Sequence, residues 1–208
     1  MKFNSRTEAA RQLTTHVLKR YRPDESWAVV SIPRGGVILG AAVARRLRLP
    51  HEIVVARKIG EEHDLEWAIG AVAEDGTAVW DPRLKAKESP AYLRKALARE
   101  RGEIKRRLMA FRKGLGPRRL KGKVALLVDD GVARGWTIVA AIKTLRRLGV
   151  KRVMVALPVA SKEGIRLIRK RADGVTALWV PKHFRTVGFY YRRFESVADK
   201  RVRDALRH

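Results

Sequence analysis

Short apolar runs alternate with amphipathic segments along the second half of the chain. The apolar runs lie at residues 124–128, 153–157 and 176–180, and the segments between them, 137–148 and 162–171, carry apolar residues every three to four positions. A continuous apolar run predicts a strand buried on both faces, whereas the wider spacing predicts a helix with one apolar side. Single helices between such strands indicate an α/β fold, an open parallel sheet flanked by helices.

The first half of the chain begins with the same pattern. Apolar runs at 27–32 and 52–56 predict two further strands, and residues 37–47 predict a helix between them. The polar stretch 58–66, which holds acidic residues and a histidine, is expected to be a loop.

Two more helices and a hairpin complete the expected elements. A helix within residues 1–22 is indicated by the capping-box sequence Ser-x-x-Glu at 5–8. The short runs 71–73 and 77–80 are separated by Glu-Asp-Gly, which is typical of a hairpin turn. A Ser-Pro pair begins a long basic helix, which we place as an insertion at 88–114.

The last part of the chain, residues 181–208, departs from this rhythm. Five aromatic residues crowd into 184–194 before a last short helical segment. We expect this part to form a C-terminal cap, or hood, over one end of the sheet. Its aromatic side chains could stack a nucleobase, pack the last helix or form a dimer contact, and the pattern leaves all three open. The chain, 1–208, has the length of a single domain.

Composition narrows the class of protein. An apolar share of 46% supports a folded core, and the absence of cysteine excludes disulfides, thiolate metal sites and cysteine nucleophiles. No stretch reaches the roughly 18 apolar residues of a membrane span, and the N-terminus lacks an apolar signal region. We therefore expect a cytoplasmic protein that does not bind membranes. One Asn, one Gln and more arginine than lysine favour a heat-adapted source.

The chain is strongly basic. It has 47 Lys and Arg residues against 21 Asp and Glu residues, a formal net charge of +26, so its partners are expected to be anionic. The segment 104–123 contains nine basic residues and no acidic one. This run predicts either a solvated helix face followed by a linker, or a surface that binds nucleic acid.

Two adjacent carboxylates stand out from this basic background. Asp129 and Asp130 are the only acidic residues between Glu103 and Glu163, and they directly follow the apolar run 124–128. Ligands of open parallel sheets bind beyond the carboxyl ends of the strands, so this pair is expected to lie at a ligand site.

The loop after the pair has the features of a phosphate site. Gly131 and Gly135 permit backbone conformations in which successive N–H groups turn inward, and a helix begins near Thr137. Carboxylates beside a phosphate site require hydroxyl groups or a metal on the ligand, and a ribose 5-phosphate offers hydroxyls. The Walker A and the dinucleotide-binding glycine patterns are both absent.

The stretch 124–137 resembles the phosphoribosyl pyrophosphate (PRPP) motif of type I phosphoribosyltransferases, an apolar strand followed by two acidic residues and a small-residue loop ending in Thr. Residues 32–36, Ile-Pro-Arg-Gly-Gly, are similar to the pyrophosphate loop of that family. Residues 57–60 and 66–76 resemble a segment of a bacterial subgroup with mostly uncharacterised members. The likeness covers the chain from Trp27 to its C-terminus.

This resemblance implies a role for each motif. Asp129 and Asp130 would be catalytic and hold the ribose 2- and 3-hydroxyls, directly or through Mg²⁺. The 5-phosphate would be enclosed by the following loop, namely Gly131, Val132, Ala133, Arg134, Gly135, Trp136 and Thr137. The pyrophosphate would be bound by Arg34, Gly35, Gly36 and Lys58.

The reaction implied by the resemblance is transfer of the phosphoribosyl group from PRPP to a nucleobase or related nitrogen acceptor, with release of pyrophosphate. Mg²⁺ would be the cofactor, a mobile loop after Lys58 would exclude water, and the protein would be a homodimer. The alternative is a regulatory protein of the same fold that binds RNA or DNA and takes PRPP or a nucleotide as effector.

Two positions depart from the family pattern. Arg134 stands where the family usually has Thr, and its guanidinium is expected to strengthen phosphate binding. Trp136 replaces a small residue, and its indole would either cover the phosphate or occlude it. His63 and His183 lack a partner at a diagnostic spacing, so we interpret both as surface residues rather than acid–base groups.

Overall fold

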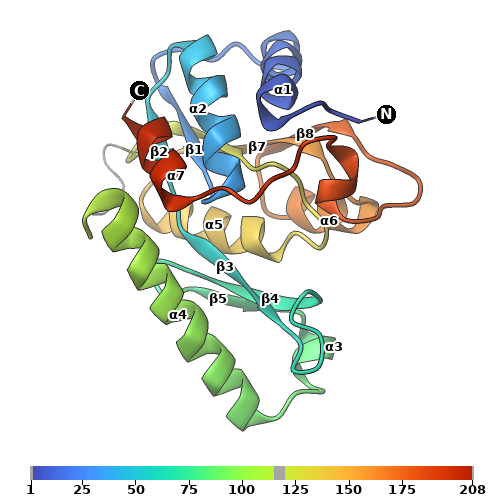
Figure 1. The fold of residues 1–208 in the computed structure, drawn as a ribbon. Helices are drawn as coiled ribbons and strands as arrows, with labels where there is room; N and C mark the ends of the chain where they lie inside the picture. The colour runs from blue at the N-terminus through green and yellow to red at the C-terminus, as the bar shows by residue number, and fades with distance from the viewer. Residues whose placement is uncertain (1, 115–119, 208) are drawn as a thin grey trace.

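The computed structural model describes residues 2–114 and 120–207 (Figure 1). Its centre is a five-stranded sheet with the order β2-β1-β6-β7-β8, in which every neighbouring pair is parallel. The strands are β1 (Trp27–Ser31), β2 (His51–Ile53), β6 (Val124–Val128), β7 (Arg152–Val159) and β8 (Gly174–Trp179). The predicted α/β fold with an open parallel sheet is confirmed.

Helices cover both faces of this sheet, which explains why its strands are continuously apolar. Figure 1 shows two helices on one face, α1 (Arg6–Arg20) and α2 (Gly35–Leu47), and two on the other, α5 (Trp136–Arg147) and α6 (Lys162–Arg169). Successive residues of β6 alternate between the two cores, since Leu126 packs among the residues of α1 and α2 and Leu127 among those of α5. Both core layers are therefore closed, as in other parallel sheets.

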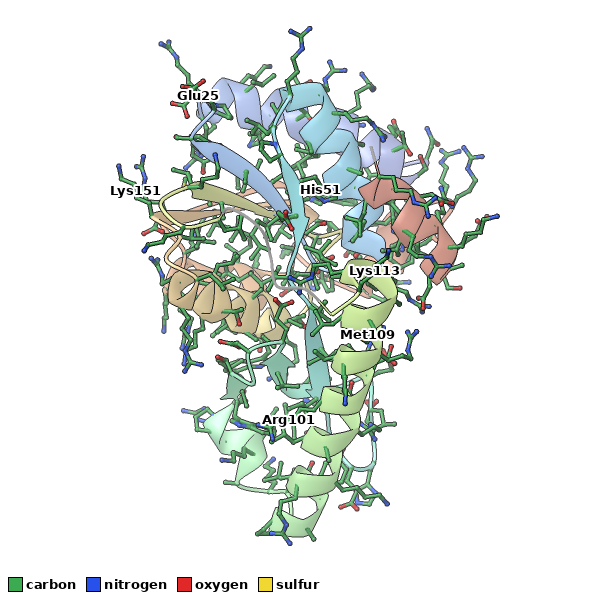
Figure 2. The ribbon with its side chains drawn as sticks, turned by 90° about the vertical axis from the view of Figure 1, so that its left-hand side faces the viewer. Glu25, His51, Arg101, Met109, Lys113 and Lys151 are labelled. Atoms are coloured by element: carbon green, nitrogen blue, oxygen red, sulfur yellow. The ribbon has the colours of Figure 1, made fainter. Side chains whose placement is uncertain are left out.

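A second lobe contains a three-stranded antiparallel sheet in the order β3-β4-β5. Its elements are β3 (Ala56–Gly60), β4 (Ala68–Ala73), β5 (Ala78–Trp80), α3 (Pro82–Lys85) and α4 (Pro90–Arg112). The predicted hairpin and the long helix are confirmed: β4 pairs with β5, and Ser89 caps α4 by accepting a hydrogen bond from the Tyr92 backbone N–H. Figure 2 shows α4 on the near side, with the exposed residues Arg101 and Met109.

Two predictions for this region are wrong. The run 52–56 is not one strand, because β2 ends at Ile53 and β3 begins at Ala56 in the other sheet. The expected loop 58–66 begins as strand, since β3 continues to Gly60. Polar side chains are tolerated in β3 because they find acidic partners: Arg57 pairs with Glu100 of α4 at 2.9 Å, and Lys58 pairs with Glu66 at 2.6 Å.

The C-terminal segment returns to the start of the chain. Phe3 and Tyr191 form a parallel bridge, and the backbone N–H of Phe3 donates to Tyr190. The short 3₁₀ helix η1 (Val187–Tyr190) precedes α7 (Asp199–Leu206), which packs against α2 and α4. Tyr190 and Tyr191 are buried, so these two aromatic residues pack the tail onto the first lobe. Among the helices of the described residues, none combines the length and hydropathy of a membrane span.

Candidate active site

The acid pair lies against the start of α2. β1 and β6 are neighbours in register, with Ser31 opposite Val128, so the chain segments that follow both strands leave the sheet at the same edge. A Cβ atom built on Gly36 would lie 2.7 Å from Oδ1 of Asp129, and one on Gly35 would lie 1.9 Å from Oδ2 of Asp130. Two motifs that are far apart in the sequence are therefore in contact, and the contact requires glycine at both positions.

Burial gives the two carboxylates unusual proton affinities. Burial and the charge of Asp130 raise the pKa of Asp129 well above its usual value, and burial also raises the pKa of Asp130. Arg6 of α1 opposes the shift at Asp130, since its Nε donates to Oδ2 at 2.8 Å. The side chains of Arg6 and Asp130 are only 11% and 14% exposed. A desolvated pair of this kind is typical of a functional site, where hydroxyl groups or a cation can bind it.

The loop between β6 and α5 is fixed to the end of β7. Val132 forms a parallel bridge with Ala160, and its carbonyl accepts a hydrogen bond from the Ser161 N–H at 2.9 Å. The Ser161 hydroxyl also donates to the carbonyl of Ala133. Gly135 adopts a left-handed conformation, with φ of 88°, and turns the chain into α5. The loop is thus held from outside, and its inner face remains free for a ligand.

The helices that begin at the site lack side-chain caps. Gly135 and Arg34 occupy the N-cap positions of α5 and α2, and neither provides a capping hydrogen bond. By contrast, serine hydroxyls cap α1, α4 and α6. Uncapped first-turn N–H groups favour anions, because they point outward at the positive end of the helix dipole.

A cavity of about 660 Å³ lies at the loop before α5, and we call it the main cavity. Asp130 and the start of α2, with Arg34, Gly35 and Gly36, do not line it. One wall is Asp129 with loop residues 131–138, which include Thr137. The others are Lys58 and Trp67 of the second lobe, and tail residues 185–188 with Phe194. Its volume lies within the usual range of small-molecule sites, roughly 300–1,000 Å³.

Of the two predicted pyrophosphate cations, Lys58 lines the main cavity and Arg34 does not, and both are already paired. The Arg34 guanidinium lies 3.8 Å from Asp199 of α7, and the Lys58 ammonium lies 2.6 Å from Glu66. The Pro33–Arg34 peptide is cis. The sequence interpretation missed two supporting arginines, Arg6 beside Asp130 and Arg107 of α4, whose guanidinium donates to the Pro33 carbonyl at 3.0 Å.

The sequence contained a signal for the buried position of Arg107. Arg107 lies three residues after Ile104, on the apolar side of α4, and it is 5% exposed. A basic residue on a buried helix face indicates an internal partner. Arg6 carries no such signal, because nothing near residue 6 distinguishes it from the other basic residues.

The two departures from the family pattern have defined surroundings. Arg134 pairs with Asp81 at 3.1 Å and Glu163 at 3.4 Å, and its guanidinium lies 4.6 Å from the ring centre of Trp67. Its expected contact with a phosphate stays a prediction. Trp136 is buried, and its indole nitrogen has no hydrogen-bond partner within the described residues. It forms part of the wall of the main cavity.

Comparisons with known proteins point in one direction. Residues 6–191 match the family model described as the phosphoribosyl transferase domain. A protein of Mycobacterium tuberculosis named as a presumed phosphoribosyl transferase, found in two strains, is 34% identical over 206 residues. The match covers 96% of this chain but 45% of that protein, so this chain spans about half the length of these curated relatives. A crystal structure from Thermus thermophilus has a TM-score of 0.80 at 37% identity and covers 99% of this chain and 98% of its own.

Proposed function

Because this chain belongs to the phosphoribosyl transferase domain family, we propose that it transfers the phosphoribosyl group of PRPP to a nucleobase or related nitrogen acceptor and releases pyrophosphate. One observation carries the proposal. The carboxylates of Asp129 and Asp130 approach the backbone of Gly36 and Gly35 so closely that a Cβ atom would not fit. This contact supports one site that uses both the acid pair and the candidate pyrophosphate loop.

In this proposal the 5-phosphate lies in loop 131–137. The uncapped N–H groups at the start of α5 and the Thr137 hydroxyl donate to its oxygens. The ribose 2- and 3-hydroxyls donate to Asp129 and Asp130, which relieves the cost of burying two adjacent carboxylates. The Arg6–Asp130 ion pair has to adjust when the ribose binds, because Arg6 and the ribose hydroxyl use the same carboxylate, that of Asp130.

The pyrophosphate lies at the start of α2. Gly35 and Gly36 offer backbone N–H groups, and Arg34 and Lys58 exchange their partners Asp199 and Glu66 for phosphate oxygens. During transfer the bond from the anomeric carbon to the pyrophosphate oxygen breaks, and its electron pair leaves with pyrophosphate. A nitrogen lone pair of the acceptor forms the new bond and the acceptor releases a proton. The carboxylates of the acid pair lower the energy of the cationic ribose that forms between bond breaking and bond formation.

The residues present fit a magnesium ion. Mg²⁺ is usually bound by one or two carboxylates, several waters and substrate phosphates, and Asp129 and Asp130 supply such carboxylates. A cluster of three or more metal-ligating side chains is absent from the described residues. When bound, Mg²⁺ would neutralise charge on the pyrophosphate.

The nucleic-acid alternative has less support. It rested on the basic segment 104–123, yet several of its arginines have partners inside the protein. Arg106 pairs with Glu103 and Asp199, and Arg112 pairs with Glu74. Arg107 is buried beneath the Pro33 carbonyl. These contacts hold α4 in place, and the side chains of Arg107 and Arg112 are less than 10% exposed, whereas that of Arg106 is exposed. Arg118 and Arg119 of the segment lie outside the described residues.

Calorimetric titration with PRPP and Mg²⁺ tests the proposal. We expect binding to the wild type and a loss of at least about tenfold in the Asp129→Asn/Asp130→Asn variant, because each charged hydrogen bond contributes about 1.5–3 kcal/mol. Glu25→Gln/Asp204→Asn is the matched control, since it removes two exposed carboxylates away from the site. Figure 2 shows Glu25 at the end of the molecule opposite the second lobe.

Two further steps separate a specific site from charge attraction. Binding to the wild type has to persist when salt is raised, because attraction to a +26 chain alone weakens steeply. A screen of nucleobases for pyrophosphate release then identifies the acceptor. Equal binding by wild type and acid-pair variant, abolished by salt, would contradict the proposal.

A further inference from the structure

A second cavity, of about 270 Å³, lies at the start of α1, and we call it the arginine cavity. Three arginines from separate parts of the chain line it: Arg6 of α1, Arg193 of the tail and Arg201 of α7. Thr7 adds a hydroxyl group, and Glu195 is the acidic member of the lining. None of its lining residues lines the main cavity.

The arginine cavity carries an excess of positive charge. Three guanidinium groups face one carboxylate, which leaves a formal charge of +2. Within the described residues, the side chains of Arg193 and Arg201 have neither an ion pair nor a hydrogen bond. Both residues are exposed to solvent, and guanidinium groups that line one concave surface favour a ligand with several oxygen acceptors.

Arg6 is held more firmly than the other two arginines. Its Nε donates to Asp130, its Nη1 donates to the Glu195 carbonyl at 3.0 Å, and its guanidinium lies 3.9 Å from the ring centre of Phe194. These contacts fix the guanidinium between the arginine cavity and the acid pair. An anion bound in the cavity would therefore compete with Asp130 for the same side chain.

The lining of the arginine cavity selects its occupant by charge. It is mostly charged or hydroxylated, with Ile38 and Val197 as the apolar members. The volume of about 270 Å³ leaves space for an anion of the size of phosphate or pyrophosphate. The chemistry that matches this lining is an inorganic oxyanion.

We infer that the arginine cavity binds inorganic phosphate or pyrophosphate, and that the bound anion acts on Asp130 through Arg6. Recognition is by Arg193, Arg201 and the Thr7 hydroxyl, with Arg6 as the shared side chain. Binding loosens the Arg6–Asp130 ion pair, and a ligand that takes Asp130 frees Arg6 for the anion. The two events therefore favour each other, as linkage requires. The site does not depend on the transfer reaction, because its own residues make the contacts.

Titration with inorganic phosphate tests the site. The Nε–Hε signal of Arg6 in a nitrogen-15 NMR spectrum, assigned by its loss in Arg6→Lys, reports binding at Arg6. Because the same Nε donates to Asp130, a variant that removes only Arg193 and Arg201 separates the arginine cavity from the acid pair. We expect this signal to shift on saturation in the wild type. In Arg193→Gln/Arg201→Gln the affinity measured by this shift falls at least about tenfold, because two charged contacts are lost.

The matched control is Arg203→Gln/Arg207→Gln, which removes the same charge from exposed positions at the end of the chain that do not line the cavity. We expect less than a twofold change in this variant. Equal losses in both variants would show charge attraction alone, and an Arg6 signal that stays fixed while phosphate saturates the protein would exclude the site.

Two further titrations define the ligand. Pyrophosphate is expected to bind at least as tightly as phosphate, because it offers more acceptor oxygens. Adenosine monophosphate is expected to bind no more tightly than phosphate at this site, since Ile38 and Val197 are the only apolar members of the lining among the described residues and give a nucleoside little to pack against. Tighter binding of the nucleotide would overturn the inference of a small inorganic anion. Each readout is direct binding, so the outcome is independent of whether PRPP is turned over.

Discussion

Single residues decide whether the candidate site can assemble. Gly35 and Gly36 begin α2, and their missing side chains leave the space in which the carboxylates of Asp130 and Asp129 lie. Neither glycine has a positive φ, so the requirement is one of space and not of backbone conformation. Gly36 is buried and Gly35 is half-buried, which agrees with this close contact.

Gly35→Ala tests this requirement for space. The new Cβ would lie 1.9 Å from Oδ2 of Asp130. The carboxylate has to move, because the end of a side chain moves more easily than the helix backbone. We expect PRPP affinity to fall at least about tenfold, with unfolding free energy within about 1 kcal/mol of the wild type. Calorimetry and urea unfolding measure the two effects. Gly102→Ala in α4 meets no atoms within 4 Å and should only stabilise the helix, by about 1 kcal/mol; unchanged affinity in Gly35→Ala would refute the steric argument.

His51 links stability to pH. Its Nε2 lies 2.7 Å from the Ser31 hydroxyl, and burial, followed by the charge of Arg45, lowers its pKa to about 4. Since an unfolded histidine has a pKa near 6.5, the unfolded chain binds the proton more readily, and stability falls as the pH decreases from about 6.5 to 4. We expect the loss in unfolding free energy due to His51 to reach at most about 3 kcal/mol.

Urea unfolding across that pH range checks this expectation. The unfolding free energy should change less steeply with pH in His51→Gln than in the wild type. The difference between the two proteins is due to the histidine, because the acid pair titrates in both. His63→Gln replaces an exposed histidine of the second lobe and should keep the wild-type slope. Identical slopes in all three proteins would contradict a buried neutral His51.

Among the elements, the loop before α5 is held by Ser161, the residue that caps α6. Ser161 caps α6 by accepting from the Gly164 N–H at 2.8 Å, and the same hydroxyl donates to the Ala133 carbonyl. One side chain therefore completes a helix and holds the outside of the candidate phosphate loop. Ser89 performs the first task alone, for α4.

Ser161→Ala and Ser89→Ala separate the two tasks. Loss of a serine cap costs about 1 kcal/mol, and we expect this destabilisation in both variants. Ser161→Ala also releases the Ala133 carbonyl and should cost about 1 kcal/mol more, with PRPP affinity reduced severalfold. PRPP affinity in Ser89→Ala should equal that of the wild type. Thermal unfolding and calorimetry provide both values, and a parallel loss of affinity in the two variants would indicate a general effect of destabilisation.

At the scale of the whole molecule, ion pairs join the two lobes within a strongly basic chain. Asp199 of α7 pairs with Arg106 of α4 at 2.6 Å and lies 3.8 Å from Arg34 at the start of α2. Within the second lobe, Arg112 of α4 and Glu74 form a further pair, in which both side chains are less than 10% exposed. These contacts are local, whereas the net charge of +26 acts across the whole molecule.

The balance of these effects predicts how salt changes stability. Screening shortens the reach of charge from about 30 Å at 0.01 M to about 8 Å at 0.15 M, which weakens repulsion among basic residues more than it weakens contact pairs. We expect the free energy of unfolding to rise with sodium chloride, by on the order of 1 kcal/mol over this range. Urea unfolding at the two concentrations measures it, because urea carries no charge. A decrease would mean that the ion pairs outweigh the net repulsion.

The accuracy of the sequence predictions followed the range of the interactions behind them. The five-residue run at Val124–Val128 was assigned correctly because complete burial leaves a local apolar pattern. The prediction of one strand at 52–56 was wrong, because the run is divided between two sheets. Its apolar residues do not reveal which neighbouring strand they pair with. The polar residues of 58–66 suggested a loop, yet β3 continues to Gly60, and Glu66 is the acidic partner of Lys58 in this strand.

The sequence by itself determined the order of elements, the parallel sheet, the position of the acid pair and the likeness to the phosphoribosyltransferase motif. Those features depend on neighbouring residues, and apolar periodicity and strand ends are visible in such short stretches. Only the tertiary structure decided that Arg6 pairs with Asp130, 124 positions away, and that Arg107 supports Pro33, 74 positions away. Such contacts arise when helices pack on the sheet, so the choice among many similar arginines is made by distance in space and leaves no mark in the local pattern.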